Sequence, residues 1–99
     1  MLRGWQEHGW QFDGKRYTGE YRVGNRSWQG YAQTPPTHNR GGLFDFYLQR
    51  PPDGVKSHAC WHHAGKGWFW VNFHAPYPDL LSGIKFIENF LAQVTGNRP

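Results

Sequence analysis

The chain has 99 residues and a formal net charge of +4, which is the size of one domain and leaves no room for two hydrophobic cores. Phe, Trp and Tyr make up 18% of the residues, and six of these are Trp, more than one such core needs. One cysteine excludes an internal disulfide and suits a reducing compartment, and no apolar stretch approaches the ~20 residues that span a bilayer. We therefore expect a single cytoplasmic domain over residues 1–99, without a cofactor.

Turn signals at regular spacing predict about five strands within residues 5–75. Asp13-Gly14 lies between two aromatic segments, and this dipeptide is a strong signal for a two-residue hairpin. The segment that follows alternates between apolar and polar side chains, as a half-buried strand does. Gly24-Asn25 predicts the next turn, so that residues 26–33 return beside the previous strand.

The second half of the sheet is predicted to follow a loop over residues 34–42, because its Pro and Gly residues are incompatible with a central strand. Alternating apolar residues then predict a strand over residues 43–50. A Pro-Pro-Asp-Gly turn at residues 51–54 precedes a hairpin, whose two strands are expected at residues 55–63 and 67–74.

After Pro78 the spacing of apolar residues changes to 3.6, which predicts an amphipathic helix over about residues 79–95. Gly96 stands where a glycine commonly ends a helix. The stripe expected to pack on the sheet comprises Leu80, Ile84, Phe86, Ile87, Phe90, Leu91 and Val94. The sequence therefore predicts an α+β fold, in which a twisted antiparallel sheet packs against one C-terminal helix.

The hairpin within residues 57–74 holds most of the chemistry in the sequence, and its meaning depends on register. A one-residue slip exchanges the two faces of a strand. A two-residue turn at Gly65-Lys66 would turn the histidines toward the core. A three-residue loop closed by Gly67 in the left-handed conformation would instead place His62 opposite Trp70. We favour this second register because an unpaired buried imidazole costs about 1–3 kcal/mol.

In the favoured register Ala64 lies opposite Trp68, and Cys60 lies opposite Asn72. The other face becomes a strip of rings and hydrogen-bonding groups, and the apolar face receives Ala59, Trp61, Phe69, Val71 and Phe73. This strip comprises His58, Cys60, His62, Trp68, Trp70, Asn72 and His74.

Aromatic rings on a basic sheet favour a non-catalytic binding module, because such rings can stack on unpaired bases. The order of elements resembles, in topology and aromatic content, the single-stranded nucleic-acid-binding domains of the Pur and Whirly type. Phosphate contacts would come from arginines, if they lie on the same side of the sheet: Arg16, Arg22, Arg26 and Arg50. The predicted ligand-binding residues are Trp68, Trp70, His62, His74, Asn72, Arg16, Arg22 and Arg26.

Three alternatives use the same hairpin. Its strip could be covered by another part of the chain, by an acidic protein surface or by a second copy in a homodimer. His58, Cys60 and His74 have the side chains of zinc ligands, but their spacing matches no established zinc pattern and a fourth ligand is not evident, so we expect no bound metal. Cys60 beside a histidine could act as a nucleophile, with Asp45 approaching from the next strand.

Overall fold

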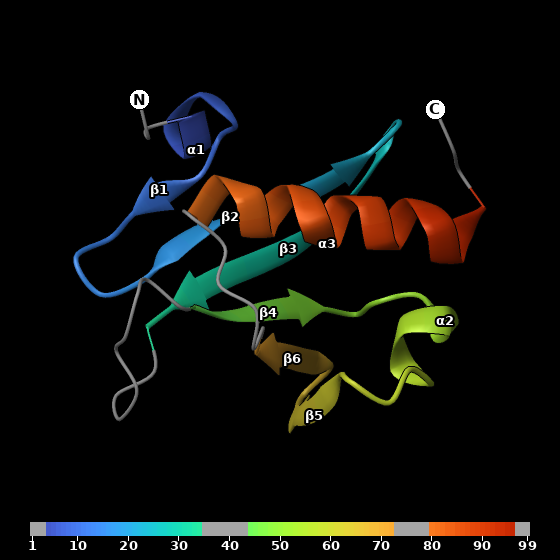
Figure 1. The fold of residues 1–99 in the computed structure, drawn as a ribbon. Helices are drawn as coiled ribbons and strands as arrows, with labels where there is room; N and C mark the ends of the chain where they lie inside the picture. The colour runs from blue at the N-terminus through green and yellow to red at the C-terminus, as the bar shows by residue number, and fades with distance from the viewer. Residues whose placement is uncertain (1–3, 35–43, 73–79, 97–99) are drawn as a thin grey trace.

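The computed structural model describes residues 4–34, 44–72 and 80–96. One antiparallel sheet has six strands in the order β1-β2-β3-β4-β6-β5. The strands are β1 (Gln11–Phe12), β2 (Tyr17–Val23), β3 (Arg26–Gln33), β4 (Asp45–Gln49), β5 (His62–Gly65) and β6 (Trp68–Asn72), and the helices are α1 (Gly4–Glu7), α2 (Asp53–Lys56) and α3 (Leu80–Thr95). Figure 1 shows α3 lying across the sheet, with α1 and α2 near its two ends. The predicted α+β fold is confirmed, with six strands rather than about five and with two additional short helices.

The first two hairpins occur where the sequence predicts them. Val23 pairs with Arg26 across the Gly24-Asn25 turn, as expected. The turn at Asp13 is longer than predicted, because Phe12 pairs with Tyr17 and leaves four residues in the loop.

The Asp13 carboxylate explains this longer loop. Its Oδ1 accepts hydrogen bonds from the backbone N–H groups of Arg16 (2.8 Å) and Lys15 (2.9 Å). These hydrogen bonds lower the pKa of Asp13, because they stabilise the charged carboxylate. The bond from Arg16 makes the larger contribution. The loop is therefore closed by this carboxylate together with a backbone hydrogen bond, in which the Asp13 N–H donates to the Arg16 carbonyl (3.0 Å).

The predicted strand over residues 55–63 is wrong in its first half, where residues 53–56 form α2. The Pro52 carbonyl accepts hydrogen bonds from the N–H groups of Val55 (2.9 Å) and Lys56 (3.3 Å). Val55 is fully buried in the core beside α3. Burial of this side chain and the two hydrogen bonds accepted by the Pro52 carbonyl stabilise a short helix in place of the predicted strand.

The register of the β5–β6 hairpin is correct at one pair and wrong at the next. His62 pairs with Trp70 as predicted, but Gly65 rather than Ala64 pairs with Trp68, because a bulge lies between His63 and Gly65. Such a bulge places one extra residue on one strand of the pair. Gly67 has a left-handed φ of 82°, which confirms the conformation predicted for it.

The core lies between α3 and the facing side of the sheet. Leu80, Ile84, Ile87 and Leu91 are buried along the helix as predicted, whereas the Phe86 side chain is 43% exposed and does not belong to the packed stripe. Gly96 follows the last turn with a φ of 71°, as expected for the glycine that ends a helix.

Large rings packed on glycines fill the centre of this core. A Cβ on Gly19 would lie 2.5 Å from Trp10 Cγ, and a Cβ on Gly30 would overlap the Tyr21 ring. Because Gly30 has no side chain, the Tyr21 ring extends over β3, and its hydroxyl donates a hydrogen bond to the Tyr47 carbonyl of β4 (3.0 Å). One tyrosine thus joins two strands that are not neighbours.

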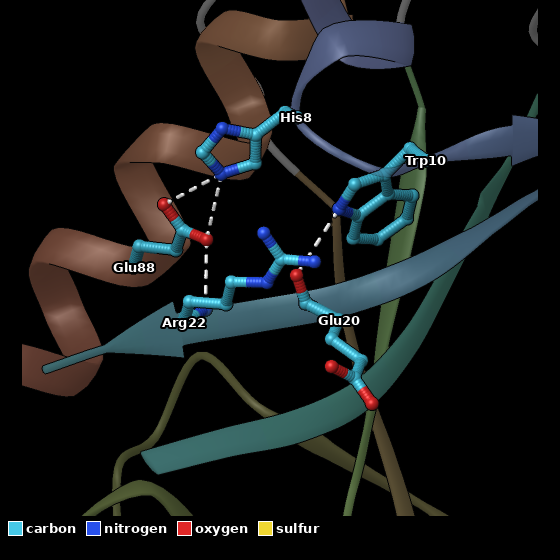
Figure 2. A network of polar contacts seen from close by, with 5 residues as sticks. All are labelled: His8, Trp10, Glu20, Arg22 and Glu88. Carbon is cyan, nitrogen blue, oxygen red and sulfur yellow. Dashed lines mark hydrogen bonds and ion pairs between the residues drawn. The ribbon is translucent and has the colours of Figure 1, made fainter. Parts of the chain in front are cut away.

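Polar contacts close the outer edge of β2 (Figure 2). The Glu88 carboxylate of α3 accepts a hydrogen bond from the Arg22 backbone N–H (2.7 Å), and its Oε2 lies 2.9 Å from His8 Nε2. Trp10 Nε1 donates to the Glu20 carbonyl at 3.2 Å. The N-terminal segment and α3 therefore fasten the part of β2 that extends beyond the short β1.

Packing of α3 on the sheet predicts a large effect of one truncation. Ile87→Ala should lower the free energy of unfolding by about 2–5 kcal/mol, because a fully buried side chain leaves a cavity when it is shortened. The exposed Lys85→Ala on the same helix is the matched control. Urea unfolding of both variants provides the measurement, and an Ile87→Ala stability within error of the control would contradict the packing described here.

Burial of Tyr21 predicts a loss of stability at high pH. Burial, followed by the nearby Glu88 carboxylate, raises the pKa of Tyr21 well above its ordinary value of 10.0. At a pH above 10.0 the unfolded chain releases the phenol proton, whereas the folded chain retains it. The free energy of unfolding therefore falls as pH rises, with a slope of up to about 1.4 kcal/mol per pH unit.

The Tyr21→Phe variant should show a shallower decline than the wild type in urea unfolding between about pH 9 and pH 11. It should also be less stable at neutral pH by about 0.5–1.5 kcal/mol, because it lacks the hydrogen bond to Tyr47. Equal slopes for the two proteins would show that Tyr21 ionises freely in the folded chain.

Candidate functional site

The face of the sheet opposite α3 carries a continuous array of rings from four strands. Tyr31 of β3 pairs with Tyr47 of β4, which pairs with Trp70 of β6, and Trp70 pairs with His62 of β5. Trp68 extends from β6 on the same face. We call this array the aromatic face, and it comprises Tyr31, Tyr47, His62, Trp68 and Trp70.

The rings of the aromatic face contact one another in sequence. Tyr31 and Tyr47 are stacked with centroids 4.3 Å apart and planes 8° apart, and Trp68 meets Tyr31 edge-on at 5.0 Å. On the other side, Trp70 lies 6.4 Å from Tyr47 and 4.7 Å from His62. Cross-strand ring pairs of this kind each stabilise a sheet by roughly 0.2–1 kcal/mol, so neighbouring rings hold each other in place.

The four Tyr and Trp rings are partly buried and His62 is exposed, and within the described residues all three helices pack on the other side. Trp68, Trp70 and His62 are among the residues predicted from the sequence, whereas the two tyrosines are not. The sequence does contain a signal for Tyr47, because this residue alternates with the buried Phe46 and Leu48 and therefore lies on the opposite face of β4. Recognising its role requires the order of β3, β4 and β6.

One arginine adjoins the aromatic face. The Arg16 guanidinium lies 4.4 Å from the centroid of the Tyr31 ring, close enough for a cation–π interaction. Arg26 instead lies 4.7 Å from the ring of the buried Trp28, and the Arg22 side chain lies against Gly9 at the β2 edge. Arg50 lies in a separate hollow with Phe69. The structure therefore places Arg16 beside the rings, but not the other three predicted arginines.

A hollow of about 350 Å³ opens at the Arg16 end of the aromatic face. Its walls combine flat rings with a cation, a carboxylate, an amide and a hydroxyl. They are formed by Asp13, Arg16, Thr18, Gln29, Gly30, Tyr31 and Trp68. Such walls suit a planar ligand with polar edges, because rings can stack on its faces while polar groups bond to its rim.

The Tyr47 phenol remains protonated at neutral pH. Partial burial, followed by the neighbouring Tyr31 and Asp45, raises the pKa of Tyr47 above its ordinary value. A neutral phenol can both donate and accept a hydrogen bond. The aromatic face therefore adds no negative charge of its own at this position.

The predicted metal ligands and nucleophile occupy a different part of the molecule. Cys60 Sγ lies 3.1 Å from His58 Nδ1, and both side chains are exposed. The His58 ring meets Phe90 of α3 at 5.0 Å, which places the pair on the helix side of the sheet. Neither residue belongs to β5, so the predicted pairing of Cys60 with Asn72 does not occur.

Within residues 4–34, 44–72 and 80–96, no group of three or more His, Cys, Asp or Glu side chains is arranged to hold a metal ion. His74, the third predicted ligand, lies outside the described residues. Asn72 ends β6 opposite Asp45, and its backbone continues the strand that carries both tryptophans.

Comparison of the chain with protein-family models, with curated proteins and with solved structures gave no significant match. In the part of the chain that the structure describes, no helix is long and apolar enough to cross a membrane.

Proposed function

We propose that the chain is a binding module that takes up single-stranded nucleic acid on its aromatic face. The observation that supports this proposal is the unbroken array of rings across β3, β4, β6 and β5. Stacking of a base on an aromatic side chain contributes about 1–3 kcal/mol, and it tolerates any sequence because every base has a flat face.

Trp68 and Trp70 supply the principal stacking surfaces in this proposal. They are two residues apart on β6 and therefore extend from the same face. Tyr31 and Tyr47 stack on each other, so their main role is to support the tryptophans and to fill the space between them. The hollow beside Trp68 then receives a base edge, with Gln29 and Thr18 as hydrogen-bonding groups.

Electrostatic attraction has a smaller role on this face than the net charge of +4 indicates. Arg16 is the one predicted arginine beside the rings, and Asp13 also lines the hollow. One cation neutralises few phosphates, and the salt dependence of binding scales with the number of phosphates that the protein neutralises. We therefore expect binding dominated by stacking, with a shallow dependence on salt.

A second candidate function is supported by the same charge distribution. Aromatic residues with few charges are typical of the centre of a protein interface, and the aromatic face has this composition. A protein partner or a second copy of the chain would then cover it. Sedimentation analysis of the free protein distinguishes a self-associating chain from a monomer that binds nucleic acid.

Replacement of one stacking ring tests the proposal. Trp70→Ala should weaken binding to an oligothymidylate of about 15 nucleotides by about 1–3 kcal/mol, as measured by fluorescence anisotropy at low salt. Phe86→Ala removes an exposed ring from α3 and should leave binding unchanged. A wild-type protein that ignores the oligonucleotide at low salt refutes the nucleic-acid proposal, and unfolding of Trp70→Ala would assign Trp70 to the core.

The salt dependence tests the role of Arg16. Arg16→Gln should reduce the slope of log K against log salt by about 0.7, the value for one phosphate contact on a single strand. Arg22→Gln removes the same charge at the β2 edge and should retain the wild-type slope. Equal slopes for all three proteins would show that Arg16 makes no phosphate contact.

A further inference from the structure

A second hollow, of about 390 Å³, lies on the helix side of the sheet, away from the aromatic face. It is bordered by the end of β4, by α2 and by the β5–β6 hairpin. Its walls are formed by Arg50, Pro51, Lys56, His63, Gly67 and Phe69. Of the five side chains among these residues, three are cationic or can become so, and two are apolar.

The backbone holds Arg50 in an unusual conformation at this hollow. Its φ of 50° is left-handed, which is uncommon for a residue other than glycine and persists only where the surroundings impose it. Its N–H donates to the Gly67 carbonyl at 2.7 Å, and a Cβ on Gly67 would lie 3.4 Å from Arg50 Cγ. The β5–β6 turn thus supports both the backbone and the side-chain stem of Arg50.

Positive charge is concentrated around the hollow. Residues 50–67 contain three Lys or Arg side chains and one Asp, and thus carry a net +2 of the +4 of the whole chain. Lys56 lies 3.4 Å from Asp53, whose side chain is 99% exposed, so water weakens this ion pair. Among the described residues, the Arg50 guanidinium has no carboxylate partner.

We propose that this hollow binds a phosphate group attached to an apolar or aromatic body. A guanidinium forms paired hydrogen bonds with phosphate oxygens, and an ammonium supports it as a point charge. The His63 ring meets Phe69 edge-on at 5.0 Å and also lines the hollow. Phe69 and Pro51 provide the apolar walls for the rest of the molecule. This site is independent of the function proposed for the aromatic face.

Titration with three small probes tests the ligand class. Phenyl phosphate should shift the backbone amide resonances of Arg50 and Gly67 in a saturable manner, inorganic phosphate should shift the same resonances with weaker affinity, and phenol should bind more weakly than phenyl phosphate. Phenol binding as tight as phenyl phosphate would overturn the proposal, since the site would then be merely apolar. Absence of a shift with both phosphates would also overturn it.

Matched variants test the two cations. Arg50→Gln and Lys56→Gln should each weaken phenyl phosphate binding about tenfold or more, because each removes a charge-assisted contact. Lys85→Gln removes the same charge from α3 and should bind as the wild type does, and Trp70→Ala should also retain this site. Arg50→Lys keeps the charge and tests the fork of the guanidinium if Arg50→Gln does not fold. The assignment would be refuted if Arg50→Gln and Lys56→Gln both bind phenyl phosphate with wild-type affinity. If Arg50→Gln is unfolded, wild-type affinity of both Arg50→Lys and Lys56→Gln would refute it instead.

Discussion

Contact between aromatic rings and bare glycine backbone holds this protein together. Apolar residues amount to only 37% of the chain, and three of the buried rings lie where a Cβ would overlap them, Trp10 on Gly19, Tyr21 on Gly30 and Phe46 on Gly83. The Tyr21 ring on Gly30 is the central example, because it extends over β3 and ends in a hydrogen bond to β4. The position of β4 relative to β2 therefore depends on a glycine. The aromatic face depends on it in turn, since Tyr47 is the residue that accepts this hydrogen bond.

Much of the fold follows from periodicity. The alternation of β2 and β4 and the 3.6-residue spacing of α3 are repeated signals, and errors at single residues do not alter them. Single local features are harder to predict. The helix α2 depends on the burial of Val55 beside α3, and the bulge after His63 depends on how β5 meets β6. Both are tertiary effects on short segments, in which local preference is weak.

The candidate site likewise combines features that one strand predicts with features that depend on the order of the strands. Two tryptophans on alternate positions of one strand are visible in the sequence, and so is the face that they share. Their union with Tyr31 and Tyr47 depends on the order β3-β4-β6, which no pattern within one strand reveals. The positions of the arginine side chains are harder still to predict, since a long side chain can lie on either side of a strand end. Arg22 follows the β2 edge and Arg26 lies on the ring of the buried Trp28.

The two ends of the sheet limit how another molecule can approach. An unpaired strand edge is a template on which an extended peptide can add a further strand. At one end the Glu88 carboxylate already accepts the outward N–H of Arg22, and β1 is only two residues long. At the other end a bulge distorts the short β5 at Ala64. Both margins thus discourage fibril-like stacking of copies. The binding sites proposed above accordingly lie on the broad surfaces of the sheet, where side chains rather than backbone groups would contact a ligand.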